Sequence, residues 1–222
     1  MSNLDFASML KYWPLFLRGA LSTVEFTIGA VMIGVVLGTI AALMKMSKVG
    51  VVSFIGKAYI EIIRGTPSLV QLFIIYFGIS QVLDMNIPKF YAAVFALGIN
   101  SGAYVAEIIR AGIEAVDRGQ MEAARSLGMP HRMAMRYIIM PQAVKNILPA
   151  LGNEFIVLLK ESSIVSVIGA SDLMRQQEII SSITYRPFEP LVVIAVIYFI
   201  MTLCLSKLIG VLERRLKAGD VR

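Results

Sequence analysis

Residues 116–143, VDRGQMEAARSLGMPHRMAMRYIIMPQA, decide the fold, because here a short polar segment passes directly into an apolar one. Glu122 near the start and Arg125 near the end suit the dipole of a short helix. Gly128 and Pro130 are typical of the point where such a helix ends. The stretch therefore predicts a short, surface-exposed helix held between two membrane spans.

The whole chain has the composition of a membrane protein. Of its 222 residues 57% are apolar and 16% are charged, and its mean hydropathy is +0.75. A soluble domain is roughly 45–50% apolar, even with glycine included, and about 25% charged. These values exclude a disordered chain, a nucleic-acid-binding tail and an ordinary cytosolic enzyme. They favour an all-α, polytopic membrane protein with a single domain, residues 1–222.

Counts of cysteine and histidine bear on metal and disulfide chemistry. The chain has one Cys, Cys204, inside an apolar run, and one His, His131, in a basic loop. A single Cys forms no disulfide within the chain, and neither residue builds a zinc site alone. The sequence therefore predicts no metal site and no bound cofactor.

Apolar runs predict five transmembrane helices, since about 20 apolar residues cross the hydrocarbon core as a helix. The expected spans cover about 19–46, 58–83, 88–113, 137–161 and 188–212. The fourth contains Lys145, Glu154, Lys160 and Glu161, so one of its faces must line protein or a water-filled cavity. Residues 6–17 are expected to form an interfacial helix ahead of the first span.

Lys and Arg residues predict the orientation. Fifteen of the 21 basic residues lie in segments 45–64, 110–145 and 207–222. Basic loops remain on the cytoplasmic side, so these segments are expected there, with the N-terminus outside and the C-terminus cytoplasmic. This topology accounts for the net charge of +6 without a nucleic-acid partner. The polar segment 169–188 is then external.

The polar loop at about 116–136 has two interpretations. One is a solvated loop that only fixes topology. The other is a docking helix for a cytoplasmic partner, because the chain has almost no soluble mass against which this helix could bury itself. Met121, Leu127 and Met133 would give such a partner adaptable apolar contacts.

A longer motif within this loop carries a family resemblance. Residues 122–141 contain EAA, three residues, G, nine residues, I, one residue and MP. This spacing resembles the EAA signature of ABC-importer permeases, EAA-x3-G-x9-I-x-L-P, with Met140 in place of Leu, a volume-conserving change. Segments 64–67 (RGTP), 99–107 (INSGAYVAE) and 150–155 (ALGNEF) resemble the polar amino-acid branch, and arginine, histidine and lysine permeases in particular.

The resemblance implies a type I importer with the MetI-like fold, in which the polar loop is the coupling helix. The implied partners are two ATPase subunits per complex, an extracytoplasmic amino-acid-binding protein and a second permease chain, identical or related. The implied location is the cytoplasmic membrane of a bacterium, where the chain crosses the lipid bilayer several times. The residues implied to couple to the ATPase are Glu122, Ala123, Ala124, Arg125, Leu127, Gly128, Arg132 and Pro141.

ATP chemistry is expected to reside outside this chain. The nearest string to a Walker A motif, residues 50–58, has the wrong spacing and lacks the Ser or Thr that binds Mg²⁺. The chain is therefore not expected to be an enzyme, and ATP and Mg would be used by the partner ATPase.

Polar residues within the expected spans are the candidates for substrate binding, since an amino acid crossing lipid must exchange water for fixed polar groups. Glu154 and Glu161 are seven residues apart and share one helical stripe. A guanidinium or ammonium group would suit either carboxylate. The full set of candidates is Glu161, Ser162, Ser163, Glu154, Asn153, Lys160, Thr66, Gln71, Asn100 and Tyr104.

Structural roles remain open for the same residues. Lys160 would form an ion pair equally well with Glu154 or Glu161. Thr66 followed by proline is also an ordinary helix start. Asn100 would form a hydrogen bond between packed helices.

The resemblance implies the permease of an ATP-driven importer that moves polar, basic L-amino acids (arginine, lysine or histidine) into the cytoplasm by alternating access. Glutamine or glutamate is the alternative substrate for a permease of this type. An ion-coupled secondary transporter is the alternative from another class, which would need its own ion site and usually more spans or an inverted repeat. An intramembrane enzyme is disfavoured, because the single His lies in a loop.

Overall fold

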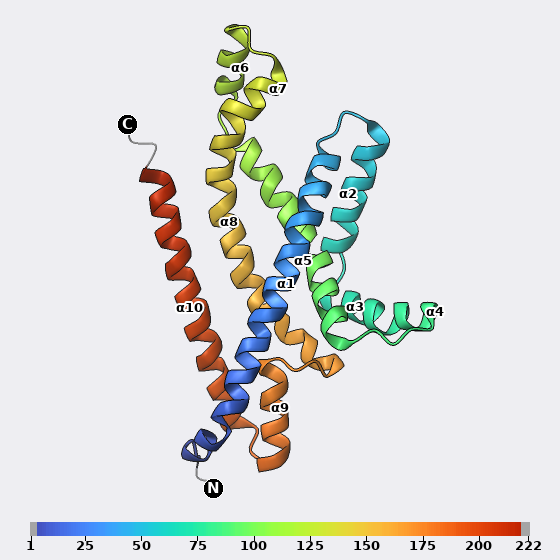
Figure 1. Cartoon of the computed structure of the whole chain (residues 1–222), viewed down its shortest axis with the longest axis vertical. Coiled ribbons are helices and arrows are strands. Elements are labelled where there is room, and N and C mark those ends of the chain that lie inside the picture. Colours follow the sequence, from blue (N-terminus) through green and yellow to red (C-terminus); the bar gives the residue numbers. More distant parts are fainter. Residues whose placement is uncertain (1–3, 219–222) are drawn as a thin grey trace.

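The computed structural model describes residues 4–218, and the elements within them are helices, as predicted (Figure 1). The α-helices are α1 (Trp13–Lys45), α2 (Gly50–Arg64), α3 (Ser68–Phe73), α4 (Ser80–Leu83), α5 (Lys89–Glu114), α6 (Arg118–Ser126), α7 (His131–Ala134), α8 (Met140–Glu161), α9 (Leu173–Thr184) and α10 (Phe188–Ala218). Short 3-10 and π segments join some of them: η1 (Ala7–Tyr12), η2 (Ile74–Ile79), η3 (Met135–Ile139) and η4 (Ser162–Ile168).

Three helices in the described part of the chain are long and apolar enough to cross a membrane. They are Ala7–Lys45, Lys89–Glu114 and Phe188–Leu216, and they coincide with the predicted spans 19–46, 88–113 and 188–212. The expected interfacial helix at 6–17 is a short 3-10 turn, η1, that continues directly into α1. The charged helix α8 is not among the three, so its role as the fourth span stays a prediction.

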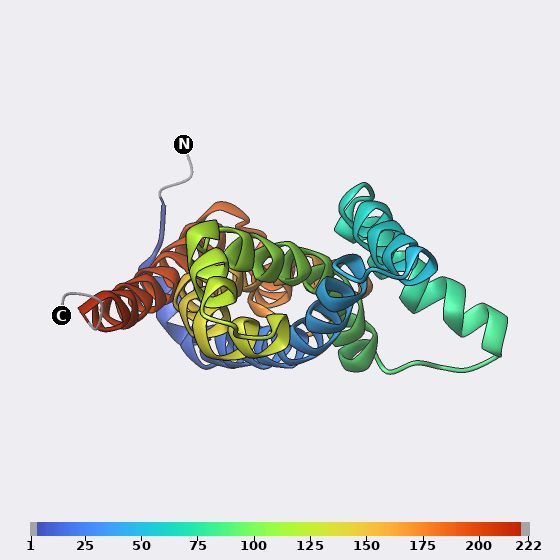
Figure 2. The ribbon, with the colours of Figure 1, turned by 90° about the horizontal axis from the view of Figure 1, so that it is seen from above.

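The predicted span 58–83 is wrong as one continuous helix. The structure divides it into α2 and the segment Ser68–Leu83, which meet at an angle of 104°. Pro67 stands at the break, and a proline keeps the preceding residue out of the helical region. Residues 50–57, expected to be loop, and 58–64, expected to begin the second span, form the helix α2 that returns alongside α1, and the segment from α3 to α4 projects sideways as an arm (Figures 1 and 2).

Small residues bring α1 and α5 into close contact along their length. A Cβ added to Gly38 would lie 2.6 Å from the Cβ of Val105. A Cβ added to Gly98 would lie 2.7 Å from the Cβ of Ile33. Small residues at such spacings let two helix backbones approach each other in a membrane, where packing rather than water drives association.

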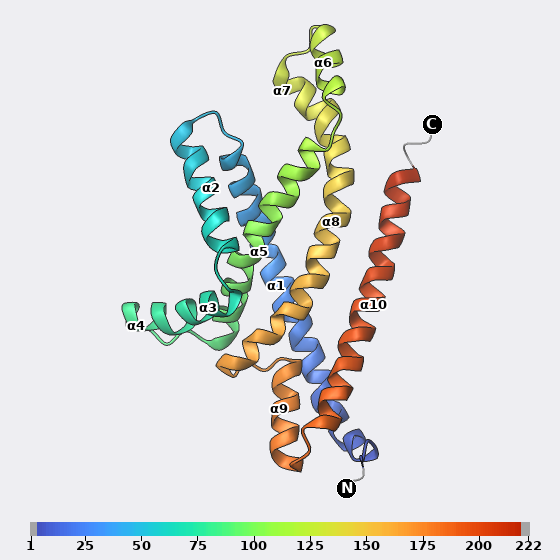
Figure 3. The same ribbon diagram turned by 180° about the vertical axis from the view of Figure 1, so that it is seen from behind.

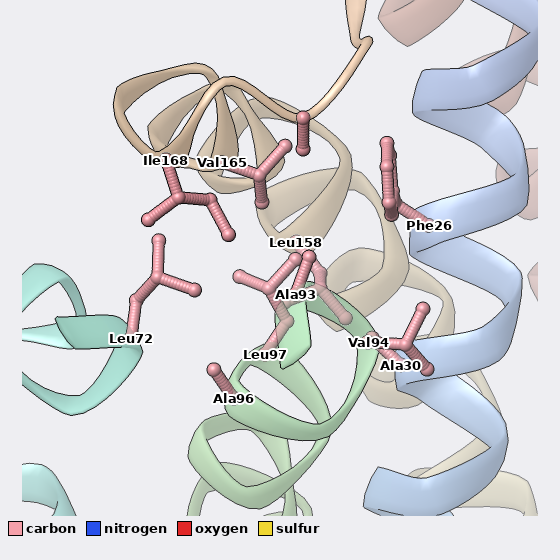
Figure 4. Close-up of a cluster of buried hydrophobic side chains, with 11 residues drawn as sticks. Phe26, Ala30, Leu72, Ala93, Val94, Ala96, Leu97, Leu158, Val165 and Ile168 are labelled. Atoms are coloured by element: carbon pink, nitrogen blue, oxygen red, sulfur yellow. The ribbon is translucent and has the colours of Figure 1, made fainter. Parts of the chain in front are cut away.

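A buried apolar cluster joins α1, α3, α5, α8 and η4 at one level of the bundle (Figure 4). Phe26, Leu72, Leu97, Leu158 and Val165 form its centre, each at most 3% exposed. The cluster fixes the bend after α2 against α5 and α8. Polar side chains from these same elements lie together beside it.

Helix α9 lies in the predicted external segment 169–188 and is fastened to α1 at its first turn. The Asp172 carboxylate accepts hydrogen bonds from the backbone N–H groups of Met174 and Arg175. The N–H of Leu173 donates to the Thr23 hydroxyl at 3.1 Å. Burial raises the pKa of the Asp172 carboxyl to about 6.

The last helix, α10, packs on α9 and on the start of α1 with its first turns, and further along it packs on α8, where Ile209 lies against Gly152 (Figure 3). Only 6% of the most apolar 18-residue stretch of α10 is buried within the chain. Most of its apolar surface therefore faces surroundings outside this chain.

Candidate functional site

A polar cavity of about 120 Å³ lies between α5 and α8. Helix α5 supplies Asn100 and Tyr104, which are four residues apart and therefore neighbours on one face. Helix α8 supplies Glu154 and Glu161, seven residues apart on one stripe as predicted. Four of the sequence candidates thus meet in one cavity, whose remaining lining residues are Val157 and Leu158.

Within the described residues, each of the two carboxylates accepts a hydrogen bond from a hydroxyl group. The Ser101 hydroxyl donates to Glu154 Oε1 at 3.0 Å, and the Ser68 hydroxyl donates to Glu161 Oε2 at 3.4 Å. Within residues 4–218 neither carboxylate forms a salt bridge, and the ion pairs with Lys160 considered above are not formed. Two uncompensated carboxylates in one cavity favour a ligand with cationic groups.

Gln71 joins this cavity to the bend between α2 and α3. Its side chain is 6% exposed. The two N–H bonds of Nε2 are shared among three acceptors: the Ile63 carbonyl at 2.8 Å, the Thr66 carbonyl at 3.1 Å and the Thr66 hydroxyl at 2.8 Å. Its Oε1 accepts from Asn100 Nδ2 at 3.1 Å. In this arrangement Gln71 and Thr66 hold the bend and orient Asn100.

The other candidates on α8 and η4 lie around the cavity rather than in it. Lys160 and Ser163 line a second, wider opening of about 420 Å³, which shares Glu161 with the first cavity. Ser162 is fully buried and donates to the Leu159 carbonyl at 2.8 Å. Asn153 is exposed and does not line either space. The structure therefore does not bring Ser162 and Asn153 to the carboxylates.

Arg64, predicted to lie on the cytoplasmic side within the start of the second span, belongs to this region. It is the last residue of α2, and its guanidinium carbon lies 5.4 Å from the centroid of the Tyr104 ring. Its Nη1 is 3.9 Å from Glu107 Oε2. The signal that could have placed it is the Gly-Thr-Pro that follows it, since the proline marks a helix boundary directly after Arg64.

The predicted docking helix is present as α6, at one end of the molecule (Figure 1). The Asp117 carboxylate caps it by accepting from the N–H of Gly119. Gly128 ends it with a φ of +85°, a conformation that favours glycine. Ala124 is buried against the neighbouring helices, and Leu127 is 87% exposed. The proposed coupling residues on the exposed side are Glu122, Ala123, Arg125, Leu127, Gly128, Arg132 and Pro141.

Helices apolar enough to cross a membrane, a cavity lined by two carboxylates and a helix projecting from one end are the features of a membrane-embedded solute permease. The chain belongs to the family of binding-protein-dependent transport system inner membrane components, whose model matches residues 34–218. It is 44% identical to the arginine transport system permease protein ArtQ of Bacillus subtilis, over 98% of this chain and 100% of that protein. It is 42% identical to a putative glutamine transport system permease protein, GlnP of Rickettsia typhi, over 94% and 97% of the two chains.

Solved structures agree with this assignment. A chain of a structure described as "Crystal structure of an amino acid ABC transporter with histidines" is 63% identical and superposes with a TM-score of 0.93, covering 96% of this chain and 99% of that one. The inward-facing MetNI methionine ABC transporter is 18% identical, with a TM-score of 0.72 over 96% and 99% of the two chains. That second likeness confirms the MetI-like fold of type I ABC importers. The chain is thus a permease of an amino acid ABC importer.

Proposed function

We propose that this permease moves basic L-amino acids, namely arginine, lysine or histidine, into the cytoplasm by alternating access. The observation that carries the proposal is the pair of uncompensated carboxylates, Glu154 and Glu161, in the cavity between α5 and α8. A cationic side chain would neutralise them, whereas an acidic side chain would add a third negative charge. The similarity to an arginine permease over the full chain supports the same substrate class.

The proposed assembly has five spans, with the N-terminus outside and the C-terminus cytoplasmic. The bent pair α2 and α3–α4 serves as the second span and α8 as the fourth, with its charged face turned to the substrate path. Two ATPase subunits dock on the α6 helices of two permease chains, and an extracytoplasmic binding protein delivers the amino acid. ATP and Mg are used by the ATPase, and this chain requires no cofactor. The complex resides in the cytoplasmic membrane of a bacterium.

Glutamine is the second candidate substrate, because a relative named as a putative glutamine permease matches nearly as well as the arginine permease. A neutral amide side chain would leave one of the two carboxylates without a cationic partner. The α-ammonium group would occupy only one of them. Direct competition between the two amino acids separates these possibilities.

Uptake into proteoliposomes tests the proposal. The vesicles contain this permease, its ATPase, ATP inside and the external binding protein outside, and radiolabelled arginine is added. We expect ATP-dependent uptake that lysine or histidine competes and glutamate does not. Uptake of glutamine in preference to arginine would overturn the basic substrate class. Uptake driven by an ion gradient but not by ATP would overturn the importer itself.

Replacing Gly128 with aspartate tests the docking role of α6. The φ of +85° strains any residue with a side chain at this position, so the end of the coupling helix should change shape. We expect weaker co-purification of the ATPase and loss of ATP-driven uptake. Ser182→Asp, on an exposed site of α9 far from α6, is the control and should retain both (Figure 1). Full ATPase binding and uptake by Gly128→Asp would contradict the docking assignment.

A further inference from the structure

The cavity between α5 and α8 has an incomplete set of charges for an amino acid. Its lining side chains include two carboxylates, Glu154 and Glu161, and no base. Every amino acid carries an α-carboxylate, which requires a positive partner or several N–H donors when it leaves water. A base must therefore stand close to the cavity if the cavity binds the whole zwitterion.

The bend between α2 and α3 contacts the wall of the cavity at two residues, Tyr104 and Glu161. At one end Arg64 lies over the ring of Tyr104, which lines the cavity. At the other end the Ser68 hydroxyl bonds to Glu161. Between them, Thr66 is held by Gln71, which also bonds to Asn100 of the cavity wall. The bend thus places a guanidinium beside one of these lining residues and a hydroxyl beside the other.

The Arg64 guanidinium is the loosely held member of a charge cluster at that end. Glu107 hydrogen-bonds with Lys45 and, at 2.9 Å, with Arg110. Arg64 approaches the same carboxylate only to 3.9 Å, and its side chain is 45% exposed. Arg110 also pairs with Glu114. The cluster therefore holds three bases against two carboxylates, and Arg64 is the most exposed of the three bases and has the longest ion pair.

We propose that Arg64 receives the α-carboxylate of the transported amino acid, while Glu154 and Glu161 receive its two cationic groups. Free arginine carries two positive groups and one negative group at neutral pH. The site offers the complementary set, two carboxylates and one guanidinium. The proposal rests on the proposed function and extends it, since it makes Arg64 the residue that distinguishes an amino acid from a simple cation.

Lys160 is the other base in the neighbourhood, and its position differs. It lines the wider opening beyond Glu161, together with Ser68 and Ser163, and does not line the cavity that contains Asn100 and Glu154. It has no contact with Tyr104. Lys160 therefore serves as the matched control, a base of equal charge on the far side of Glu161.

Agmatine, which is arginine without its carboxylate, provides the test. Binding of radiolabelled arginine to the purified permease–ATPase complex is measured in competition with unlabelled arginine and agmatine. The wild-type complex should prefer arginine by about tenfold or more, because hydrogen bonds between charged groups contribute more than the 1.4 kcal/mol that a factor of ten requires. In Arg64→Gln the affinity for arginine should fall to that for agmatine, while agmatine binding stays unchanged. Arg64→Lys should restore part of the preference, and Lys160→Gln should keep it.

If Arg64 has only a structural role, Arg64→Gln should weaken the binding of arginine and of agmatine equally, and that result would overturn the proposal. So would an Arg64→Gln complex that still prefers arginine, a Lys160→Gln complex that loses the preference, or a wild-type complex with no preference. ATP-driven uptake by the wild-type complex is measured in parallel. Failure of that uptake would overturn the proposed function itself, whereas arginine uptake with an unaltered preference in Arg64→Gln would overturn the assignment of Arg64 alone.

Discussion

Replacing Gln71 with leucine perturbs the hydrogen bonds that hold the bend. Leucine keeps much of the apolar volume and removes the amide, so that the carbonyls of Ile63 and Thr66 lose a donor and Asn100 loses an acceptor. These contacts are partly buried, so water replaces them only in part. The bend should become less stable and less precisely angled.

The structure sets the size of this effect. Two N–H groups and one carbonyl oxygen of Gln71 are engaged, and hydrogen bonds of this type contribute roughly 1 kcal/mol each. The expected loss is therefore about 3 kcal/mol. One kcal/mol corresponds to about 2–4 °C in the unfolding midpoint of a chain of this length, so the midpoint should fall by about 6–12 °C.

Differential scanning fluorimetry of the purified permease–ATPase complex measures the midpoint, and Gln177→Leu is the control. Gln177 is 5% exposed, almost the same as Gln71, and its Nε2 donates one hydrogen bond, to the Ser181 hydroxyl at 2.7 Å. Its loss should lower the midpoint by about 2–4 °C. Gln71→Leu should also reduce arginine uptake, and Gln177→Leu should not. Equal midpoints for the two variants would refute the reasoning.

Gly38→Ala should destabilise the complex by about 1–3 kcal/mol, because the added Cβ meets Val105 at 2.6 Å in a packed interface. Gly50→Ala, which meets nothing within 4 Å, is the comparison, and a scan in which both behave alike would contradict the α1–α5 packing described here. Asp172→Asn tests a pH dependence. The raised folded pKa of about 6 means that Asp172 stabilises fully below about pH 4 and that this stabilisation is lost as the pH rises through 6. The asparagine variant should therefore have the same unfolding midpoint as wild type near pH 4 and a higher midpoint than wild type at pH 8. Equal midpoints of the two proteins at pH 8 would show that burial does not raise the pKa of this carboxyl.

The length of the apolar runs was enough to predict the three most apolar helices. The runs at 19–46, 88–113 and 188–212 correspond to α1, α5 and α10, because lipid-compatible helices need no further information than length and hydropathy. Helix α8 was more difficult because of its four charged residues. Its stripe of carboxylates was nevertheless predictable, since a spacing of seven depends only on helical geometry.

The bend and the role of its residues were not predictable in the same way. Pro67 signalled a helix boundary, yet the angle of 104° depends on Gln71 reaching back to two carbonyls and across to Asn100. Such contacts join residues up to 29 positions apart and leave no periodic pattern. For the same reason the charge pattern alone places Arg64 on the cytoplasmic side, and only the tertiary contact with Tyr104 reveals its position beside the cavity.

The length of the bend also fixes the distance between two side chains that contact the cavity wall. Three residues separate Arg64 from Ser68, and these two side chains contact Tyr104 and Glu161 of the cavity wall. One added residue lengthens an extended segment by about 3.3–3.6 Å. An insertion or deletion at this point would therefore change the length of molecule that fits between these two side chains, while leaving the helices that cross the membrane in place. Within such a scaffold, substrate size can diverge through a single short segment, separately from the charges carried by α8.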